Sequence, residues 1–137
     1  MNEMAYRQYG AQTGMMLEVG VCVYKIGTRE WMRFRGVLDT GAIGSSVSPF
    51  VVKRLGLQTM QVLPFRFGVH EQSSEVVRVH LKVDEVCVRD MDCFLADRYY
   101  GYDVVIGMDV LSQGDLCILH RKNGVGRFLF DVPSAED

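Results

Sequence analysis

The sequence predicts an all-β domain with one or two short helices. Most of its apolar residues fall in short runs rich in valine and aromatic residues, which favour strands. Glycines and small polar clusters, which are typical of turns, separate these runs. At 137 residues the chain has the length of one domain that buries its own core. We therefore expect a single folded unit in which strands predominate.

The first two strands are expected to form a hairpin. Residues 15–24 are rich in valine and partly alternate with other residues, which indicates a strand. Residues 25–30 form the turn, and residues 31–38 (WMRFRGVL) form a second strand that ends directly before Asp39. The hairpin therefore places Asp39 at the start of the next turn.

A short helix is expected after that turn. Ser48 is a suitable N-cap, Pro49 suits the first helical position, and Gly56 ends the helix after Leu55. The later expected elements are strands over residues 63–69 and 76–83 around a polar tip at 70–74, short strands at 85–88 and 91–96, a buried strand at 104–106, a short helix at 108–112, and a closing hairpin of 116–120 with 127–132 through Asn123-Gly124.

Composition and charge argue against several classes of function. The net charge of −2, without any run of lysines and arginines, disfavours a nucleic-acid or anionic-membrane partner. No segment approaches 18 consecutive apolar residues, and the first eight residues lack the apolar stretch of a signal peptide. We therefore expect a soluble, cytoplasmic protein. The four cysteines and three histidines lack metal-ligand spacing, so we expect buried free thiols and no metal or other cofactor.

The tripeptide Asp39-Thr40-Gly41 follows an apolar strand, which is how an aspartic protease presents its catalytic carboxylate. Two carboxyl groups that share one proton can hydrolyse a peptide bond, because one polarises the carbonyl group and the other activates water. The tripeptide occurs once, and a two-lobed protease would need roughly twice this length. The second carboxylate must then come from a second copy of the chain. The alternative is an ordinary Asx-type turn.

Two segments together resemble a known family. Residues 37–42 (VLDTGA) and 104–111 (VVIGMDVL) are similar to the two signature blocks of the retropepsin-like aspartic proteases, the homodimeric relatives of the retroviral protease. The resemblance covers about residues 15–133, with Met108-Asp109 where retroviral members carry Arg-Asn. It implies a closed β-barrel of one lobe, a homodimer with an extended peptide or protein substrate, and a domain of residues 13–133 between flexible ends at 1–12 and 134–137.

The resemblance also implies roles for individual residues. Asp39 would be the catalytic carboxylate, Thr40 would hydrogen-bond across the dimer axis, and Gly41 would let backbone approach the carboxylates. Ile106-Gly107 would pack beneath this turn. A flap hairpin around residues 67–76 would close over the substrate and exclude water. The residues expected to contact substrate are Ala42, Phe67, Gly68, Val69, His70 and Ile106.

Two hypotheses of function remain open at this point. The first is a homodimeric aspartic endopeptidase that uses two Asp39 carboxyls and works at acidic to neutral pH. The second is a catalytically silent module with the same fold that binds peptides or dimerises without cutting. The intact Asp-Thr-Gly-Ala sequence favours the enzyme, because a binding module has no need of a carboxylate that is costly to bury.

Overall fold

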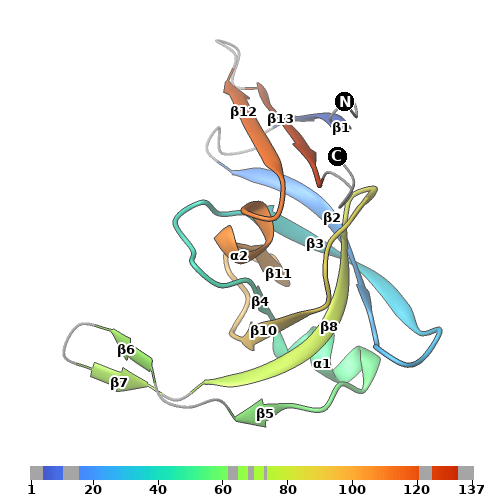
Figure 1. Cartoon of the computed structure of the whole chain (residues 1–137), viewed down its shortest axis with the longest axis vertical. Coiled ribbons are helices and arrows are strands. Elements are labelled where there is room, and N and C mark those ends of the chain that lie inside the picture. The colour runs from blue at the N-terminus through green and yellow to red at the C-terminus, as the bar shows by residue number, and fades with distance from the viewer. Residues whose placement is uncertain are drawn as a thin grey trace.

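The computed structural model describes residues 5–10, 16–61, 65–67, 70–72, 74–120 and 125–132. Strands predominate among these residues, and the two helices are short, which confirms the all-β prediction (Figure 1). The elements are β1 (Ala5–Gly10), β2 (Leu17–Tyr24), β3 (Trp31–Leu38), β4 (Ser46–Val47), α1 (Pro49–Leu55), β5 (Met60–Gln61), β6 (Phe65–Phe67), β7 (His70–Gln72), β8 (Glu75–Val83), β9 (Val86–Cys87), β10 (Met91–Leu95), β11 (Val104–Ile106), α2 (Met108–Leu111), β12 (Asp115–His120) and β13 (Val125–Asp131).

Six strands close into a barrel, as the resemblance implies. They follow the order β10, β4, β11, β3, β2 and β8, and β10 also pairs with β8, which leaves no open edge between the first and last strand. The expected hairpin of β2 and β3 is confirmed, with Leu17 opposite Leu38 and Tyr24 opposite Trp31. This register places the end of β3 at the barrel rim, where the chain continues into Asp39.

The core lies inside the barrel because side chains alternate across its strands. In β2, Leu17, Val19, Val21 and Val23 are buried while the residues between them are partly exposed. Valines and a leucine of β8 line the same core, and Phe128 and Phe130 of β13 are almost fully buried against it. Burial of these apolar side chains is the main force that holds the barrel and the β13 sheet together.

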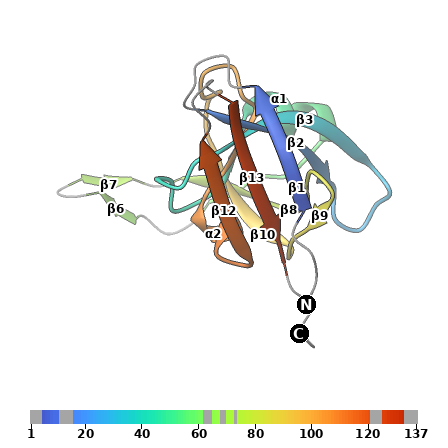
Figure 2. The same cartoon turned by 90° about the horizontal axis from the view of Figure 1, so that it is seen from above.

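A three-stranded sheet of β1, β13 and β12 packs beside the barrel (Figure 2). The closing hairpin of β12 and β13 is confirmed, whereas its expected turn at Asn123-Gly124 lies outside the described residues. Ala5–Gly10, which the sequence places in a flexible end, forms β1 and pairs with β13 from Ala5 opposite Phe130 to Gly10 opposite Val125. Strand β1 pairs with one edge of β13, whose backbone N–H and C=O groups would otherwise have no partner there.

Helix α1 has the predicted boundaries. Ser48 is its N-cap residue, Pro49 its first residue, and Gly56 follows it in the left-handed conformation with φ of 62°. The Ser48 side chain makes no capping bond, however. Its hydroxyl group donates instead to Asp103 at 2.6 Å, so this serine joins α1 to the segment before β11.

A separate hairpin of β6 and β7 extends from the barrel (Figures 1 and 2). Phe67 pairs with His70, so the two strands are joined through Gly68 and Val69, which lie outside the described residues. The predicted polar tip at residues 70–74 is therefore wrong, because His70–Gln72 forms a strand. A two-residue connection that contains glycine is a hairpin signal, but the polarity of the residues after it made them resemble a turn.

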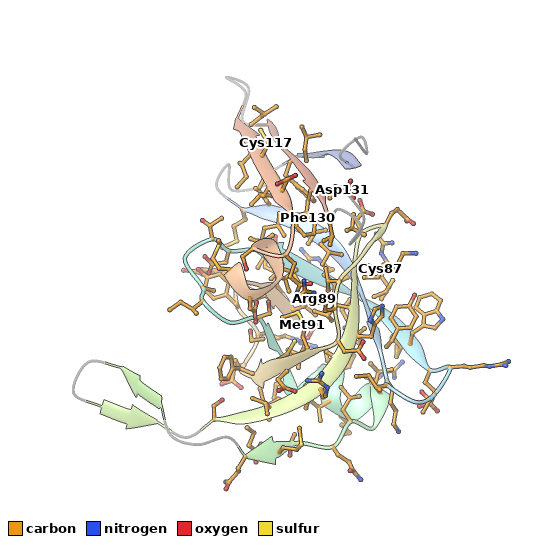
Figure 3. The ribbon with its side chains drawn as sticks, in the orientation of Figure 1. Cys87, Arg89, Met91, Cys117, Phe130 and Asp131 are labelled. Atoms are coloured by element: carbon orange, nitrogen blue, oxygen red, sulfur yellow. The ribbon has the colours of Figure 1, made fainter. Side chains whose placement is uncertain are left out.

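The cysteines are free, as expected, but they differ in burial. Cys93 is buried, and burial raises the pKa of its thiol to about 12, with smaller contributions from Asp109 and Asp92. Cys87 is exposed, so the expectation of a buried thiol is wrong there; it and Cys117 lie on separate elements (Figure 3). None of the helices that the structure describes is both long and apolar enough to cross a membrane.

Candidate active site

The turn after β3 presents Asp39 at the rim of the barrel. Strand β11 runs parallel to β3, with Ile106 opposite Leu38, and the Ile106 carbonyl accepts a hydrogen bond of 2.9 Å from the Asp39 amide. The amide of Ala42 donates to the Asp39 carbonyl at 3.2 Å, which closes a tight turn. The position of Asp39 is therefore set by two strands and by its own turn.

Within the part of the chain that the structure describes, the Asp39 carboxylate is held at one oxygen. The Gly41 amide donates to Oδ1 at 2.9 Å, and no hydrogen bond reaches Oδ2 from the residues that the structure describes. Thr40 and Gly41 are exposed, and Asp39 is partly exposed. A Cβ atom at Gly41 would lie 3.2 Å from Oδ1, so a larger residue would crowd the carboxylate. The turn thus offers a carboxylate with one free oxygen at the surface.

The segment around Gly107 supports this turn from the side of the barrel. The amides of Met108 and Asp109 donate to the carbonyls of Ala42 and Ile43, at 2.8 and 3.0 Å. A Cβ atom at Gly107 would lie 2.7 Å from the Ala42 carbonyl oxygen and 2.9 Å from that of Gly44. Only glycine allows so close a contact between the two backbone segments. This agrees with the expectation that Ile106-Gly107 packs beneath the turn.

A buried hydrogen-bond network joins the two segments. Ser45 has no exposed surface, and its amide and hydroxyl groups donate to Asp109 Oδ2 and Oδ1 at 2.9 and 2.6 Å. The Gly107 amide donates to the Ser45 hydroxyl oxygen at 2.8 Å, and the Val110 amide donates to Asp109 Oδ1 at 2.8 Å. Both Asp109 oxygens are therefore engaged in holding α2 against the loop after Asp39.

Sequence reasoning missed the role of this network. Ser45 carried no signal, and Asp109 was notable only because it stands where retroviral members carry asparagine. The two residues are 64 positions apart, so no local pattern links them. The one available hint was that Asp109 lies inside the second motif segment and that Ser45 follows the first by three residues.

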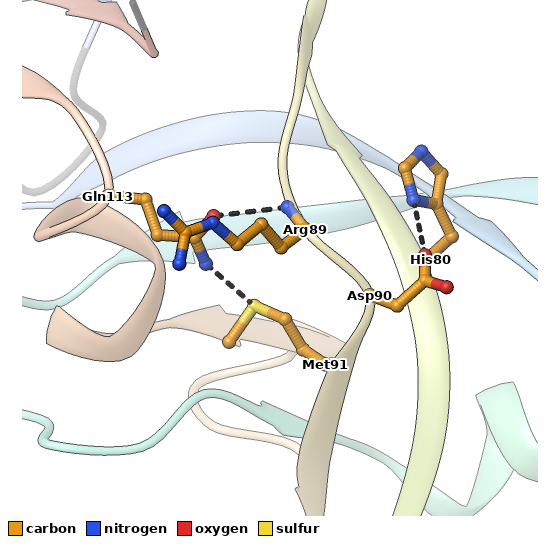
Figure 4. A network of polar contacts seen from close by, with 5 residues as sticks. All are labelled: His80, Arg89, Asp90, Met91 and Gln113. Atoms are coloured by element: carbon orange, nitrogen blue, oxygen red, sulfur yellow. Dashed lines mark hydrogen bonds and ion pairs between the residues drawn. The ribbon is translucent and has the colours of Figure 1, made fainter. Parts of the chain in front are cut away.

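Two further contacts fix the surroundings of the turn. Asp103 accepts from the Ser48 hydroxyl group at 2.6 Å and from Arg98 Nε at 2.7 Å, which ties the start of β11 to α1. Gln113 follows α2, accepts from the Arg89 amide at 3.0 Å and donates to the sulfur of Met91 at 3.4 Å (Figure 4). These contacts anchor both helices to the barrel.

The structure brings only some of the predicted site residues together. Asp39, Thr40, Gly41 and Ala42 share one turn. The Ile106 side chain is fully buried in the core and its carbonyl group supports Asp39, while the proposed contact of Ile106 with substrate stays a prediction. Phe67 and His70 pair at the end of the β6–β7 hairpin, Gly68 and Val69 lie outside the described residues, and the proposed substrate contacts of these four stay predictions.

We expect Ser45→Ala to destabilise the protein by about 1–3 kcal/mol, because it leaves the buried Gly107 amide without a partner and removes one of the two hydrogen bonds to Asp109 Oδ1. Urea unfolding measures this change in the free energy of unfolding. Ser112→Ala is the matched control, since Ser112 is exposed, and should change stability by less than about 0.5 kcal/mol. Equal effects of the two substitutions would contradict a structural role for the network.

Two proteases are among the solved structures that are similar to this one. A retropepsin-like aspartic protease from Rickettsia conorii aligns with a TM-score of 0.61, over 96% of this chain and 97% of that chain, at 9% sequence identity. The chain has the retropepsin-like fold. EIAV protease complexed with the inhibitor HBY-793 aligns with a TM-score of 0.54, over 74% of this chain and 90% of that chain, at 16% identity.

The chain resembles these two proteases in its backbone fold but very little in its sequence. The sequence matches no protein-family model and no curated protein, and identities of 9 and 16% show the fold alone. Within this retropepsin-like fold, the Asp39 turn, the Gly107 segment and the Ser45–Asp109 network form one connected unit at the barrel rim. What this unit does depends on its chemistry, because one fold serves many functions.

Proposed function

We propose that the chain is an aspartic endopeptidase that works as a homodimer, with one Asp39 carboxyl group from each subunit. The observation that carries this proposal is the exposed Asp39 turn, in which Gly41 holds one carboxylate oxygen and no described residue binds the other. Such a turn is half of a two-carboxylate site. The retropepsin-like fold supports the same conclusion by analogy.

Among the described residues, no neighbouring carboxylate of the same chain is a good candidate for the second half. Both oxygens of the Asp109 carboxylate accept hydrogen bonds from Ser45. Oδ1 also accepts a hydrogen bond from the Val110 amide. Asp103 accepts from Ser48 and Arg98. Because these two carboxylates already hold the structure together, a second copy of Asp39 is the better source.

The chemistry follows from placing two carboxyl groups side by side. Two carboxylates a few ångströms apart repel strongly, so the pair retains one proton. The protonated carboxyl donates to the scissile carbonyl group, and the ionised one accepts a proton from the attacking water. This requires no metal and no covalent intermediate. Because the pair must keep this one proton to act, we expect peptidase activity at acidic to neutral pH.

Other residues would assemble the dimer and hold the substrate. Thr40 is exposed beside Asp39, where its hydroxyl group can bond to the same turn of a partner subunit. The β6–β7 hairpin would act as a flap over an extended peptide held by main-chain hydrogen bonds. Ile43 is 85% exposed in the single chain, directly after the turn, and a partner subunit or a substrate would cover it.

Incubation with a mixed peptide library at several pH values tests the proposal. We expect cleavage that a transition-state-mimicking aspartic protease inhibitor blocks, together with a dimer in light scattering across a concentration series. Cleavage by a strictly monomeric protein would contradict the two-subunit site. Peptide binding without cleavage at any pH would favour the silent binding module.

A further inference from the structure

Two adjoining grooves lie on the barrel between the turn that joins β2 to β3 and the end of α1. Their volumes are about 590 and 380 Å³, and Lys25 and Gly56 line both of them. In both views of the molecule this region lies on the side opposite the β6–β7 hairpin (Figures 1 and 2). No residue of the Asp39 turn or of the Gly107 segment lines either groove, so the grooves are separate from the candidate active site.

The charge of these grooves differs from that of the whole protein. Five positive side chains and one carboxylate, Glu30, line them, although the chain has a net charge of −2. Such a local excess of positive charge attracts anions to one place on the surface. The positive side chains are Lys25, Arg29, Lys53, Arg54 and Arg78.

Three of the five cations make no ion pair with a described residue, and one of these three, Arg54, lies over the Phe50 ring. Lys25 lies 3.8 Å from Glu30, and Arg78 lies 3.2 Å from Asp92. By contrast, Arg29 and Lys53 make no ion pair with any residue that the structure describes. Their charges are available to a ligand without first breaking an internal contact. They come from different elements, the β2–β3 turn and α1, so they converge on the groove from two sides.

The backbone that carries the cations is well defined. The Thr28 hydroxyl group donates to the Lys25 carbonyl at 2.8 Å and accepts from the Glu30 amide at 3.1 Å, which stabilises the turn. A Cβ atom at Gly56 would lie 3.7 Å from Lys25 Nζ, so the Lys25 ammonium group lies near the end of α1. Preorganised charges lose less conformational entropy when a ligand binds.

We propose that this basic groove binds an acidic segment of a protein partner or substrate. A compact group of cations fits a short run of carboxylates, whereas a nucleic acid needs a positive track along its backbone. Trp31 is 53% exposed at the groove and stacks on Tyr24 at 5.8 Å between ring centroids. The outer face of the Trp31 ring offers an apolar contact beside the carboxylates of the bound segment. The inference concerns binding alone and does not require that the chain cleaves peptides.

Fluorescence anisotropy with a short labelled peptide of glutamate and glycine tests this proposal on the whole chain. We expect binding that weakens as NaCl rises from about 50 to about 300 mM, because screening acts on exposed charges. The same peptide with glutamine in place of glutamate should not bind. Arg29→Glu and Lys53→Glu should each weaken binding by about three- to tenfold, as expected for exposed charge pairs that are reversed.

Arg89→Glu is the matched control, because it makes the same change in charge beside Gln113 and outside both grooves. It should change binding by less than about twofold. Equal loss of binding in Arg89→Glu and Arg29→Glu would overturn the proposal, since net charge alone would then explain the binding. Unchanged binding in both groove variants, or displacement of the peptide by a single-stranded oligonucleotide of equal charge at lower concentration, would also overturn it. Circular dichroism verifies that each variant is folded.

Discussion

Replacing Asp39 by asparagine is expected to reduce peptide hydrolysis by at least about a thousandfold, because the amide can neither share the proton nor activate water. The fold should persist, since the only hydrogen bond of the Asp39 side chain to a described residue comes from the Gly41 amide, and asparagine keeps an oxygen at that position. Activity with the cleaved peptides and thermal unfolding measure the two effects.

Asp97→Asn is the matched control for this substitution. Asp97 is exposed and has no polar partner among the described residues, so the same chemical change should leave activity within about twofold. If Asp39→Asn retains normal activity, Asp39 is not the catalytic carboxylate and the proposed function fails.

Mixing the two forms of the chain also tests the requirement for two subunits. At equal amounts of wild-type and Asp39→Asn chains with free exchange, about one quarter of dimers carry two carboxyls, so activity should fall to about one quarter of the all-wild-type value. If each chain worked alone, activity would fall only to about one half. This experiment separates a shared site from a complete site in one subunit.

Gly107→Ala is expected to destabilise the protein by about 1–3 kcal/mol or more. Its Cβ atom would lie under 3.0 Å from backbone atoms of Ala42 and Gly44, which cannot move aside as a flexible side chain does. The backbone of Gly107 has φ of −99°, which alanine adopts without strain, so the cost comes from this contact alone. Urea unfolding at fixed protein concentration gives the change.

Gly27→Ala separates the two reasons for which glycine is required. No atom lies within 4 Å of a Cβ at Gly27, but its φ is +79°, so only conformational strain of about 1 kcal/mol is expected. We also expect Gly107→Ala, and not Gly27→Ala, to lower peptidase activity, because only Gly107 touches the loop after Asp39. A smaller loss of stability in Gly107→Ala than in Gly27→Ala would contradict this account of the contact.

Features that act over a few residues could be predicted from the sequence. The boundaries of α1 follow from Ser48, Pro49 and Gly56, which affect only the turn of helix next to them. The strand that ends at Asp39 was visible as an apolar run before a turn. A hairpin was predicted in the region of β6 and β7, but its tip was predicted at residues 70–74, where the structure has strand β7. Polarity alone does not distinguish a polar strand from a turn.

Features that join distant segments could not be predicted. Strand β1 forms because β13 offers it an edge, and nothing within residues 5–10 indicates that edge. The Ser45–Asp109 bonds connect residues 64 positions apart. The same is true of the basic groove, since Arg29 and Lys53 come together only when the β2–β3 turn meets the end of α1.

By itself the sequence determined the barrel strands β2, β3, β8, β10 and β11, the first helix and the position of Asp39 in a tight turn, because hydrophobic pattern and turn residues act locally. The tertiary structure alone decided that the barrel closes through β10 and β8, that Ile106 supports the turn by its carbonyl group, and that Ser45 and Asp109 hold the loop. These features depend on which backbone groups and buried polar atoms find partners, and partners are chosen only when distant segments pack together.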